Sequence, residues 1–458
     1  STNNIVKMWN EWGIAMKYHG HYEFAGHAYP GRTLPFLKYS GENQKYVLTE
    51  QALKAGVEIM NRVMVFDLIT NKEGRVIGAL GLSLRELKVI VYECKAVMLG
   101  TGGVTRLWPA PTPTCEFNRA HPGTSTGDGR MMAFRAGAPL SNLELVGRHA
   151  GPKYYARAGQ ATWVGVLRER NGQPVGPFID KPERIYGDIT TEVHKGIFDE
   201  YLKSGRGPIY MDMSGISDDD MEYMMYWLRH EGNLGLMNHV AEEGQSWKNL
   251  AVEFQTFEMA VASGLIFNFK GETSLKGLYG GGDDGIGGIS AAATFGWAAG
   301  DASAKYVKTV KAEDTKSGKT DIEARVALFD QLMSRQGGPE WATWQEVGSI
   351  LQQVMYDYCG LLRSAVTMEA GMDVLKRVKD KAYKLMAAAN PHELGRCLEV
   401  LNLIDLAELV LVGAYDRKET RGQHKRSDYT LTNPLNNDKR HNVKLVNGKI
   451  ITEWEQIK

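Results

Sequence analysis

Two glycine-rich turns hold the groups in this chain that are best suited to bind a phosphate. Gly100–Gly103 (Gly-Thr-Gly-Gly) follows the apolar run 96–99, whose lack of polar alternation suits a strand buried on both faces. Its glycines have no Cβ, so a ligand can approach the backbone there. Thr124–Gly129 (Thr-Ser-Thr-Gly-Asp-Gly) opens a predicted helix over 130–135, where free N–H groups and the positive end of the helix dipole suit a pyrophosphate. Either turn alone is an ordinary feature, but both in this order predict a pyrophosphate-binding site.

The adjacent Arg148 and His149 could bind an anionic substrate or move a proton. A histidine hydrogen-bonded to the backbone explains the pattern equally well, so both interpretations stay open. His19 and His21 could suggest a metal, but no carboxylate or cysteine shares their spacing, and we predict no metal site there. The four cysteines are scattered without a CxxC spacing, which argues against an iron–sulfur cluster, a zinc site or a disulfide framework in this chain.

Length and composition exclude several classes of protein. With 458 residues the chain is long enough for more than one domain. Lys plus Arg and Asp plus Glu number 54 each, so no global field favours nucleic acid or an anionic membrane. Nowhere do about eighteen apolar residues run without a charge, so we predict neither a transmembrane helix nor a signal peptide. Scattered thiols fit a reducing, cytoplasmic setting.

The elements that must position these residues follow from the apolar pattern. Four β-rich runs predict a small antiparallel sheet before the strand at 96–99, and they lie at 57–60, 63–66, 76–84 and 89–92. Apolar residues recur at helical spacing from residue 321 onward, which predicts helices over 322–336, 341–358, 370–389 and 393–411. Asn447-Gly448 between two strand-like segments predicts a C-terminal hairpin over 439–454.

The turns and their surroundings resemble a known family. Leu99–Val104, the Thr-Ser-Thr-Gly-Asp-Gly turn and the run RAGAPLSNLELV at 135–146 are similar to the flavoprotein subunits of succinate dehydrogenase, fumarate reductase and adenylylsulfate reductase. In that family an Ala-Thr-Gly-Gly after the strand and the Thr-Ser-Thr-Gly-Asp-Gly both contact FAD. The resemblance thus implies that FAD contacts Gly100, Thr101, Gly102, Gly103, Ser125, Thr126, Gly127 and Asp128.

A third glycine-rich stretch extends the resemblance. Gly277–Asp284 (GLYGGGDD) is similar to the family's Gly-Leu-Tyr-Ala-Cys-Gly-Glu, and a small-residue helix follows from Gly287 to Tyr306. In the family the acidic residue holds a ribityl hydroxyl, and the helix N-terminus faces the pyrimidine edge of the flavin, where it favours negative charge. The residues of this chain at those positions are Gly282, Asp283, Ser290 and Ala291.

The resemblance also implies the fold and the domains. It implies an α/β flavoprotein with a Rossmann-like FAD-binding domain, an inserted α+β capping domain and a C-terminal helical domain. We assign 1–146 and 266–310 to the FAD-binding domain, 147–265 to the capping domain, 311–412 to the helical domain and 413–458 to a C-terminal tail. No GxGxxG follows a strand, so we expect the family's N-terminal ADP-binding βαβ unit to be missing.

The substrate side departs from the family. His149 matches the histidine that binds a substrate carboxylate, but the family's Pro-Thr does not follow it. Gly187 stands where relatives carry the arginine that protonates fumarate, which leaves Arg184 in the preceding turn as a substitute. Phe257 and Glu258 stand near the place of a second substrate histidine. The candidate catalytic residues are therefore His149, Arg148 and Arg184, and we do not predict succinate or fumarate as the substrate.

Arg417–Asp428 resembles the family's Arg-Lys-Glu-Ser-Arg-Gly-Ala-His motif. Glu419, Arg421 and His424 in it could be catalysts, but we favour a structural role.

These features together predict an FAD-dependent oxidoreductase subunit. It would pass electrons between a small, anionic or thioester substrate and a separate iron–sulfur subunit in a hetero-oligomer, since this chain offers no cluster ligands. An alternative is a flavin-carrying relay or structural subunit without substrate chemistry of its own. Adenylylsulfate reductase activity is a third possibility.

Overall fold

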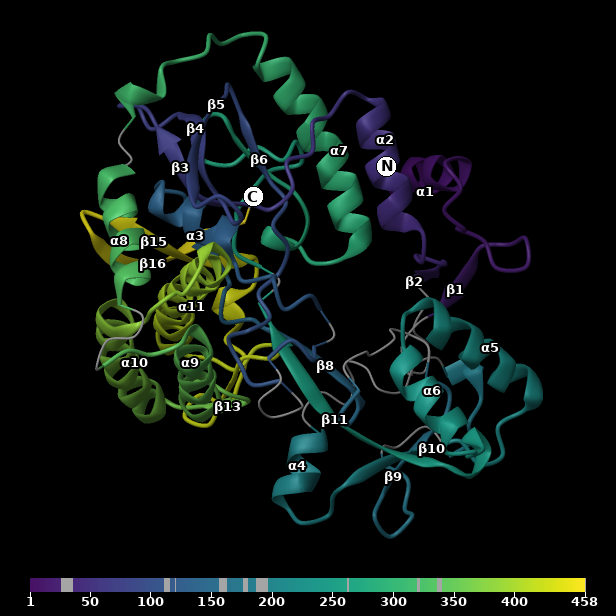
Figure 1. Cartoon of the computed structure of the whole chain (residues 1–458). Coiled ribbons are helices and arrows are strands. Elements are labelled where there is room, and N and C mark those ends of the chain that lie inside the picture. Colours follow the sequence, from purple (N-terminus) through teal and green to yellow (C-terminus); the bar gives the residue numbers. More distant parts are fainter. Residues whose placement is uncertain are drawn as a thin grey trace. The chain divides into compact units, whose positions relative to one another are not determined.

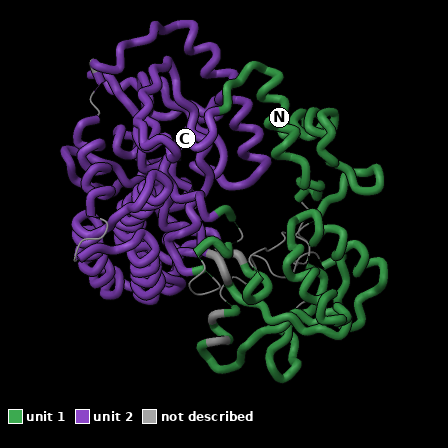
Figure 2. Tube along the Cα trace, in the orientation of Figure 1, with its two compact units in different colours: residues 1–59, 110–122, 148–258 green, residues 60–109, 123–147, 259–458 purple. Residues whose placement is uncertain are grey.

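The computed structural model describes residues 1–25, 36–110, 116–119, 121–155, 163–175, 180–186, 197–261, 263–318, 322–335 and 340–457. The side chains of seven further residues within these ranges lie outside the description: Arg148, His149, Asp199, Leu202, Phe257, Glu258 and Ser317. The chain divides into two compact units (Figure 2). The first comprises residues 1–59, 110–122 and 148–258, and the second comprises 60–109, 123–147 and 259–458. Residues 1–59, which the sequence assigned to the FAD-binding domain, thus cluster with most of the predicted capping segment; the five-segment assignment remains a prediction.

The first unit is built on a four-stranded sheet with the order β8–β11–β10–β9. These strands are β8 (Gly147–Pro152), β9 (Val166–Glu169), β10 (Ile209–Asp212) and β11 (Ala251–Ala260). The helices α4 (Ile197–Lys203), α5 (Asp218–His230) and α6 (Leu234–Glu242) belong to the same unit (Figure 1). Trp163, Met211 and Met224 are fully buried in its core. The N-terminal part adds α1 (Thr2–Glu11), the short antiparallel pair β1 (Glu23–Ala25) and β2 (Phe36–Lys38), and α2 (Gln44–Lys54).

The second unit begins with an antiparallel sheet of β3 (Val63–Thr70), β4 (Val76–Ser83) and β5 (Lys88–Glu93). This confirms the strands expected at 63–66, 76–84 and 89–92. The strand expected at 57–60 is wrong, because these residues form no ladder and Val57, Ile59 and Met60 are exposed. Gly56 at φ +80° turns the chain out of α2 just before them, in the left-handed conformation of a helix C-terminus.

A two-stranded parallel ladder joins β6 (Val97–Leu99) to β12 (Leu278–Gly280). The next α-helix in sequence after β6 is α3 (Asp128–Arg135), and the next after β12 is α7 (Ile289–Tyr306). Leu99 is buried but Met98 is 42% exposed, so the expectation of a strand buried on both faces is wrong. Among the described residues β6 pairs with β12 alone, and one face of the pair stays open at Met98.

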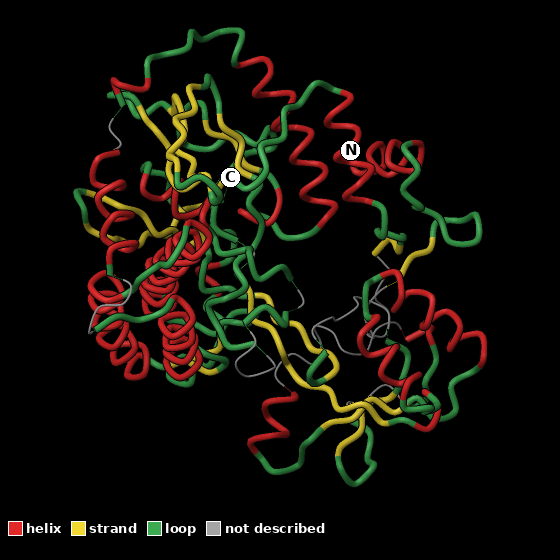
Figure 3. The backbone as a smooth tube through the Cα atoms, viewed as in Figure 1, coloured by secondary structure: helices red, strands yellow, loops and turns green. Residues whose placement is uncertain are grey.

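The rest of the second unit is helical and ends in a hairpin (Figure 3). The helices are α8 (Ile322–Ser334), α9 (Trp344–Tyr358), α10 (Ala365–Leu385) and α11 (Pro391–Asp416), which confirms four predicted helices with shifted ends. Helix α11 is buried along most of its length, and Asn390 caps its N-terminus by accepting from the N–H of Glu393. The predicted hairpin is confirmed as β15 (Lys439–Val446) and β16 (Lys449–Gln456), and β15 also pairs with β7 (Leu140–Ser141). The short strands β13 (Leu362–Arg363), which precedes α10, and β14 (Lys425–Arg426), which follows α11, form a parallel pair. Among the described residues no helix is both long and apolar enough to cross a membrane.

Candidate flavin site

Two of the predicted turns leave the same end of the parallel ladder. Val97 pairs with Leu278 and Leu99 with Gly280, so Gly100–Gly103 and Gly281–Asp284 both follow the carboxyl ends of adjacent strands. Asp284 joins them directly, because its carboxylate accepts from the backbone N–H of Thr101 at 2.6 Å and from the Thr101 hydroxyl at 2.5 Å. Turns that are about 180 residues apart in sequence are therefore fixed side by side, at the edge where open α/β sheets bind ligands.

The third turn lies against the same two residues. Gly129, the second residue of α3, is so close to them that a Cβ there would lie 2.3 Å from Thr101 Oγ1 and 3.0 Å from Asp284 Oδ1. Gly127 precedes α3 at φ +80°, and a Cβ on it would meet Leu406 and Val104 at 2.8 and 2.9 Å. Only glycine fits at these positions, because a side chain lacks space at both and Gly127 also has a left-handed backbone. The Thr-Ser-Thr-Gly-Asp-Gly sequence thus encodes the close approach of α3 to the first turn.

Arg130 directly follows the third turn, and its side chain connects that turn to the other two. Its guanidinium is fully buried and donates to the carbonyl oxygens of Ser263 at 2.7 Å and Gly102 at 2.7 Å. It also donates to the carbonyl oxygen of Asp283. One side chain therefore connects the 100–103 turn, the 261–264 segment and the 282–284 turn. Arg130 was not among the predicted site residues, although it directly follows the glycine-rich turn.

The charges in this group are balanced within the protein. Arg130 Nη1 lies 3.8 Å from Asp284 Oδ1, and both side chains are inaccessible to solvent. Burial lowers the pKa of Arg130, opposed by the charges of Asp284 and Asp283, and burial raises the pKa of Asp284, opposed by Arg130 and the Thr101 contacts. Arg130 and Asp284 therefore form a desolvated ion pair, and removal of either side chain would leave the other charge buried without its ionic partner.

The predicted binding residues fall into two groups. The Asp128 carboxylate has partners within the protein: it accepts from Thr126 Oγ1 at 2.6 Å and from Asn402 Nδ2 of α11 at 2.5 Å. Burial raises its pKa, while those two hydrogen bonds lower it. Asp128, Thr126 and Gly127 thus hold their turn in place through contacts within the protein. Ser125 lies between these and the first turn, since its hydroxyl would be 3.2 Å from a Cβ on Gly102.

The second group lines an open rim. Gly100 and Thr101 are exposed, and a Cβ on Gly100 would meet no atom within 4 Å. Asp283 accepts from the N–H of Gly288 at 2.8 Å, which holds the loop that opens α7. Gly282 is buried at φ +78° against Ala292 of that helix.

The N-terminus of α7 is open. Gly288 precedes it without a side-chain cap, and Ile289 and Ser290 are exposed with Ala291 half-buried. The first-turn N–H groups of a helix have no intrahelical partner and carry its positive dipole end. Backbone N–H groups, exposed glycine backbone and a helix N-terminus without a side-chain cap at one edge suit a flat ring system with an electron-rich carbonyl edge and a phosphate tail, so the residues present fit a flavin nucleotide.

The substrate-side candidates belong to the first unit. Arg148 and His149 are in β8, and their side chains lie outside the described part, as does Gly187. Arg184 begins a single 3-10 turn (Arg184–Tyr186), where its Nε lies 3.3 Å from Asp220 Oδ1 of α5. Its guanidinium also lies 5.0 Å from the ring centre of Tyr223, and its side chain is 49% exposed. Arg184 is thus a half-exposed cation that contacts two side chains of α5.

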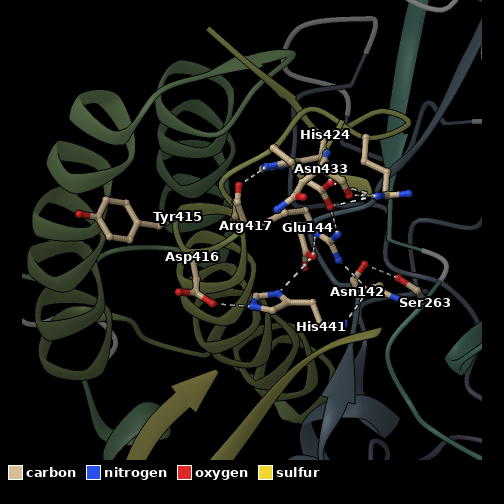
Figure 4. Close-up of polar contacts among 12 residues, drawn as sticks. Asn142, Glu144, Ser263, Tyr415, Asp416, Arg417, His424, Asn433 and His441 are labelled. Carbon is tan, nitrogen blue, oxygen red and sulfur yellow. Dashed lines mark hydrogen bonds and ion pairs between the residues drawn. The ribbon is translucent and has the colours of Figure 1, made fainter. Parts of the chain in front are cut away.

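Side chains of the Arg417–Asp428 motif are buried and paired within the protein, which agrees with the structural role that we favour (Figure 4). Glu419 is fully buried and accepts from Arg417 at 2.7 Å and from Arg421 at 2.9 Å. His424 is buried between Arg363 Nη1 at 2.9 Å and the Arg417 carbonyl oxygen at 3.1 Å. Burial and the charge of Arg363 lower the pKa of His424 to about 3, so it is neutral at physiological pH.

Parallel strands whose carboxyl ends carry two glycine turns, with a third glycine turn joined to them, define an α/β nucleotide-binding protein of the flavoprotein class. Residues 9–284 match the family described as FAD binding domain, and 349–456 match Fumarate reductase flavoprotein C-term. The chain belongs to this FAD-binding family of flavin-dependent oxidoreductases, and its cofactor is FAD.

Relatives from two organisms show how far the similarity reaches. Over 437 residues the chain is 24% identical to a subunit of the fumarate reductase (CoM/CoB) of Methanothermobacter marburgensis, covering 90% of this chain and 75% of that one. It is 23% identical over 410 residues to the fumarate reductase flavoprotein subunit of Haemophilus influenzae, covering 81% of this chain but 65% of that one.

A solved structure shows the same fold. Adenylylsulfate reductase from Archaeoglobus fulgidus superposes with a TM-score of 0.83 at 20% identity, covering all of this chain and 81% of that one.

Proposed function

We propose that this protein is an FAD-carrying subunit that exchanges electrons between a small substrate and an iron–sulfur partner. The observation that carries the proposal is the junction of three glycine turns by Asp284 and Arg130 at the end of the β6–β12 ladder. Bound FAD supplies the chemistry, since it takes up a hydride and releases electrons singly. Similarity to fumarate reductase subunits supports the assignment.

The residues of the rim would hold the cofactor. Gly100, Thr101, Gly102 and Gly103 would receive it along the backbone, since a side chain at Gly100 would enter the space that it needs. Gly282 and Asp283 would border the ribityl chain, and Ser290 and Ala291 would direct their N–H groups at the electron-rich edge of the ring. Ser125, Thr126, Gly127 and Asp128 would act by holding the rim in place.

The partner and the substrate follow from what the chain offers. Among the described residues, His, Cys, Asp and Glu side chains nowhere gather in threes as a metal would need. Electrons would therefore leave the flavin for a cluster on another protein chain. On the substrate side we propose Arg148 and His149 as binding or proton-transfer groups, with Arg184 as a further cation for an anionic substrate.

The test replaces Gly100 with valine. Gly100→Val should leave the unfolding midpoint of the apoprotein unchanged, because no atom lies within 4 Å of the new Cβ. The purified variant should nevertheless lose most of its flavin absorbance per protein. The matched control is Gly300→Ala in α7, which also meets no atom within 4 Å but lies more than two helical turns beyond Ser290 and Ala291. Full flavin content in Gly100→Val would contradict the site.

The alternative of an electron relay without its own substrate is favoured by one observation, the ion pair that occupies Arg184. Stopped-flow mixing of the flavin-reduced complex with candidate small acceptors separates the two functions. Reoxidation by a small molecule supports the enzyme, and exchange with the iron–sulfur partner alone supports the relay.

A further inference from the structure

A buried cluster of charges lies where the C-terminal hairpin meets the rest of the second unit (Figure 4). Glu144 is fully buried and accepts from Arg417 Nε at 2.5 Å. His441 of β15 lies with Nδ1 3.3 Å from Glu144 Oε1 and Nε2 2.8 Å from Asp416 Oδ2. The Arg417 guanidinium also lies 4.6 Å from the ring centre of Trp454 on β16. None of these residues belongs to the flavin rim.

Asn142 connects this cluster to the backbone segments that lead to the glycine turns. Its side-chain oxygen accepts from Arg417 Nη2 at 2.8 Å and from the N–H of His441 at 3.1 Å. Its own N–H donates to the carbonyl oxygen of His441 at 2.8 Å. Asn142 has φ +52°, a left-handed conformation that asparagine tolerates better than most residues. Contacts from two elements thus hold one strained residue.

The contact continues from Asn142 toward the turns. Its carbonyl oxygen accepts from Ser263 Oγ at 2.9 Å, and the Ser263 carbonyl oxygen accepts from Arg130 Nε at 2.7 Å. Arg130 in turn donates to Gly102 and Asp283. A continuous series of hydrogen bonds therefore runs from Arg417 and His441 through Asn142, Ser263 and Arg130 to two of the glycine turns.

We propose that Asn142 and Ser263 are positioning residues that couple the charge state of the Glu144–Arg417–His441 cluster to the FAD affinity of the glycine turns. The proposal rests on the proposed function in that these turns bind FAD. Loss of the positive charge on His441 leaves Glu144 and Asp416 with less compensation, so the loop that carries Asn142 and Glu144 shifts. Ser263 and Arg130 pass that shift to Gly102 and Asp283.

The groups that face His441 explain why its charge can change near neutral pH. Burial and the charge of Arg417 lower the pKa of His441, but contacts with Asp416 and Glu144 outweigh them and raise it to about 8. Burial raises the pKa of Glu144, while His441 and Arg417 outweigh it and lower it to about 2. Glu144 thus stays ionised across the physiological range. His441 is the member of this triad whose charge changes between pH 7 and 9.

The experiment measures the dissociation constant of FAD by titrating the full apoprotein between pH 6 and 9. The wild type should bind FAD more weakly as the pH rises, with a midpoint near the pKa of His441, which is about 8. Ser263→Ala removes one hydrogen bond and should weaken binding about fivefold at pH 6. It should also flatten the pH profile, because the side-chain link from Asn142 toward Arg130 is then lost and the backbone hydrogen bond from the Ser141 N–H to the Gly264 carbonyl oxygen is left to join the two segments. His441→Gln should abolish the midpoint.

Matched controls are Ser303→Ala, which removes a serine-to-carbonyl hydrogen bond within α7, and His392→Gln at an exposed histidine outside the cluster. Both should keep the wild-type profile. A wild-type profile in Ser263→Ala would overturn the proposal, even if His441→Gln failed to fold. FAD binding without pH dependence would overturn it while leaving the proposed function intact, and absence of FAD binding at every pH would overturn both.

Discussion

Replacing Gly129 with alanine tests the close approach of α3 to the first turn. Gly129 is buried, and the added methyl group would lie 2.3 Å from Thr101 Oγ1 and 3.0 Å from Asp284 Oδ1. These are the atoms of the 2.5 Å hydrogen bond that links two of the turns. Either the Thr101 hydroxyl rotates away and the hydrogen bond is lost, or α3 moves outward.

The size of the effect follows from two possible destabilising contributions and one stabilising contribution. A hydrogen bond to a charged group contributes about 1.5–3 kcal/mol, and overpacking a buried site costs about 1–3 kcal/mol. Alanine is more favourable than glycine in a helix by up to about 1 kcal/mol. Since one of the two costs is incurred and not both, the net loss in the free energy of unfolding should be roughly 0–3 kcal/mol, which is about 1–3 kcal/mol relative to Gly300→Ala, and FAD binding should weaken because the Thr101 turn is displaced.

Denaturant unfolding of the apoprotein, followed by tryptophan fluorescence, measures the loss, and FAD titration measures the displacement. Gly300→Ala is again the matched control: it adds the same methyl group within α7, meets no atom within 4 Å, and should gain up to about 1 kcal/mol. If Gly129→Ala unfolds at the same denaturant concentration as Gly300→Ala, the Thr101–Asp284 contact does not determine how α3 packs, and the description of the site fails.

Two further predictions concern charges. The pKa of His441 is raised from 6.5 to about 8, so its contribution of about 2 kcal/mol is complete below pH 6.5 and is lost as the pH rises through 8. The pKa of His424 is lowered to about 3, so its contribution is complete above pH 6.5 and is lost as the pH falls toward 3. Apoprotein stability should thus decline on both sides of about pH 6.5, and a flat denaturation midpoint from pH 5 to 9 would contradict both assignments. Arg184→Ala should lower stability by less than about 1 kcal/mol, because its ion pair with Asp220 is half exposed, and should leave flavin content unchanged. A loss of flavin in Arg184→Ala would show that Arg184 contributes to the cofactor site.

Much of the candidate flavin site could be predicted because glycines mark the positions where its turns come close to one another or leave the backbone open. Gly127 and Gly129 stand where no Cβ fits, and Gly100 stands where a Cβ would enter open space. At Gly127 and Gly129 contacts within the protein exclude any side chain, whereas at Gly100 the absence of a Cβ leaves the backbone open to a ligand. The order of strand, turn and helix around them is likewise local, and the structure places these segments together.

The residues that join the turns could not be predicted in the same way. Arg130 and Asp284 work through contacts with segments far along the chain, including Ser263 and Thr101. Nothing in the local pattern shows which of two neighbouring carboxylates, Asp283 or Asp284, is buried. For the same reason the environment of Asp128 depends on Asn402, a residue on a helix 274 positions later.

Met98 shows a different reason for failure. The apolar run 96–99 predicts a buried strand, yet its burial depends on how many neighbours the strand acquires. One parallel partner covers one edge only, and the pattern of a single strand carries no information about the size of its sheet.

Two helix N-termini reach this site, and the protein's own carboxylates distinguish between them. Asp284 lies beside the first turn of α3, and Asp128 occupies that turn, so negative charge is already present at the positive end of this helix. Helix α7 has no acidic residue in its first turn and no side-chain cap, and the Asp283 carboxylate reaches its N-terminus at the N–H of Gly288. The N–H groups of Ile289, Ser290 and Ala291 have no intrahelical partner, so they are the donors that α7 offers to an electron-rich group of a ligand. Arg130 supplies the countercharge to Asp284 from within the protein, so the contacts that join the turns are formed by the chain's own residues.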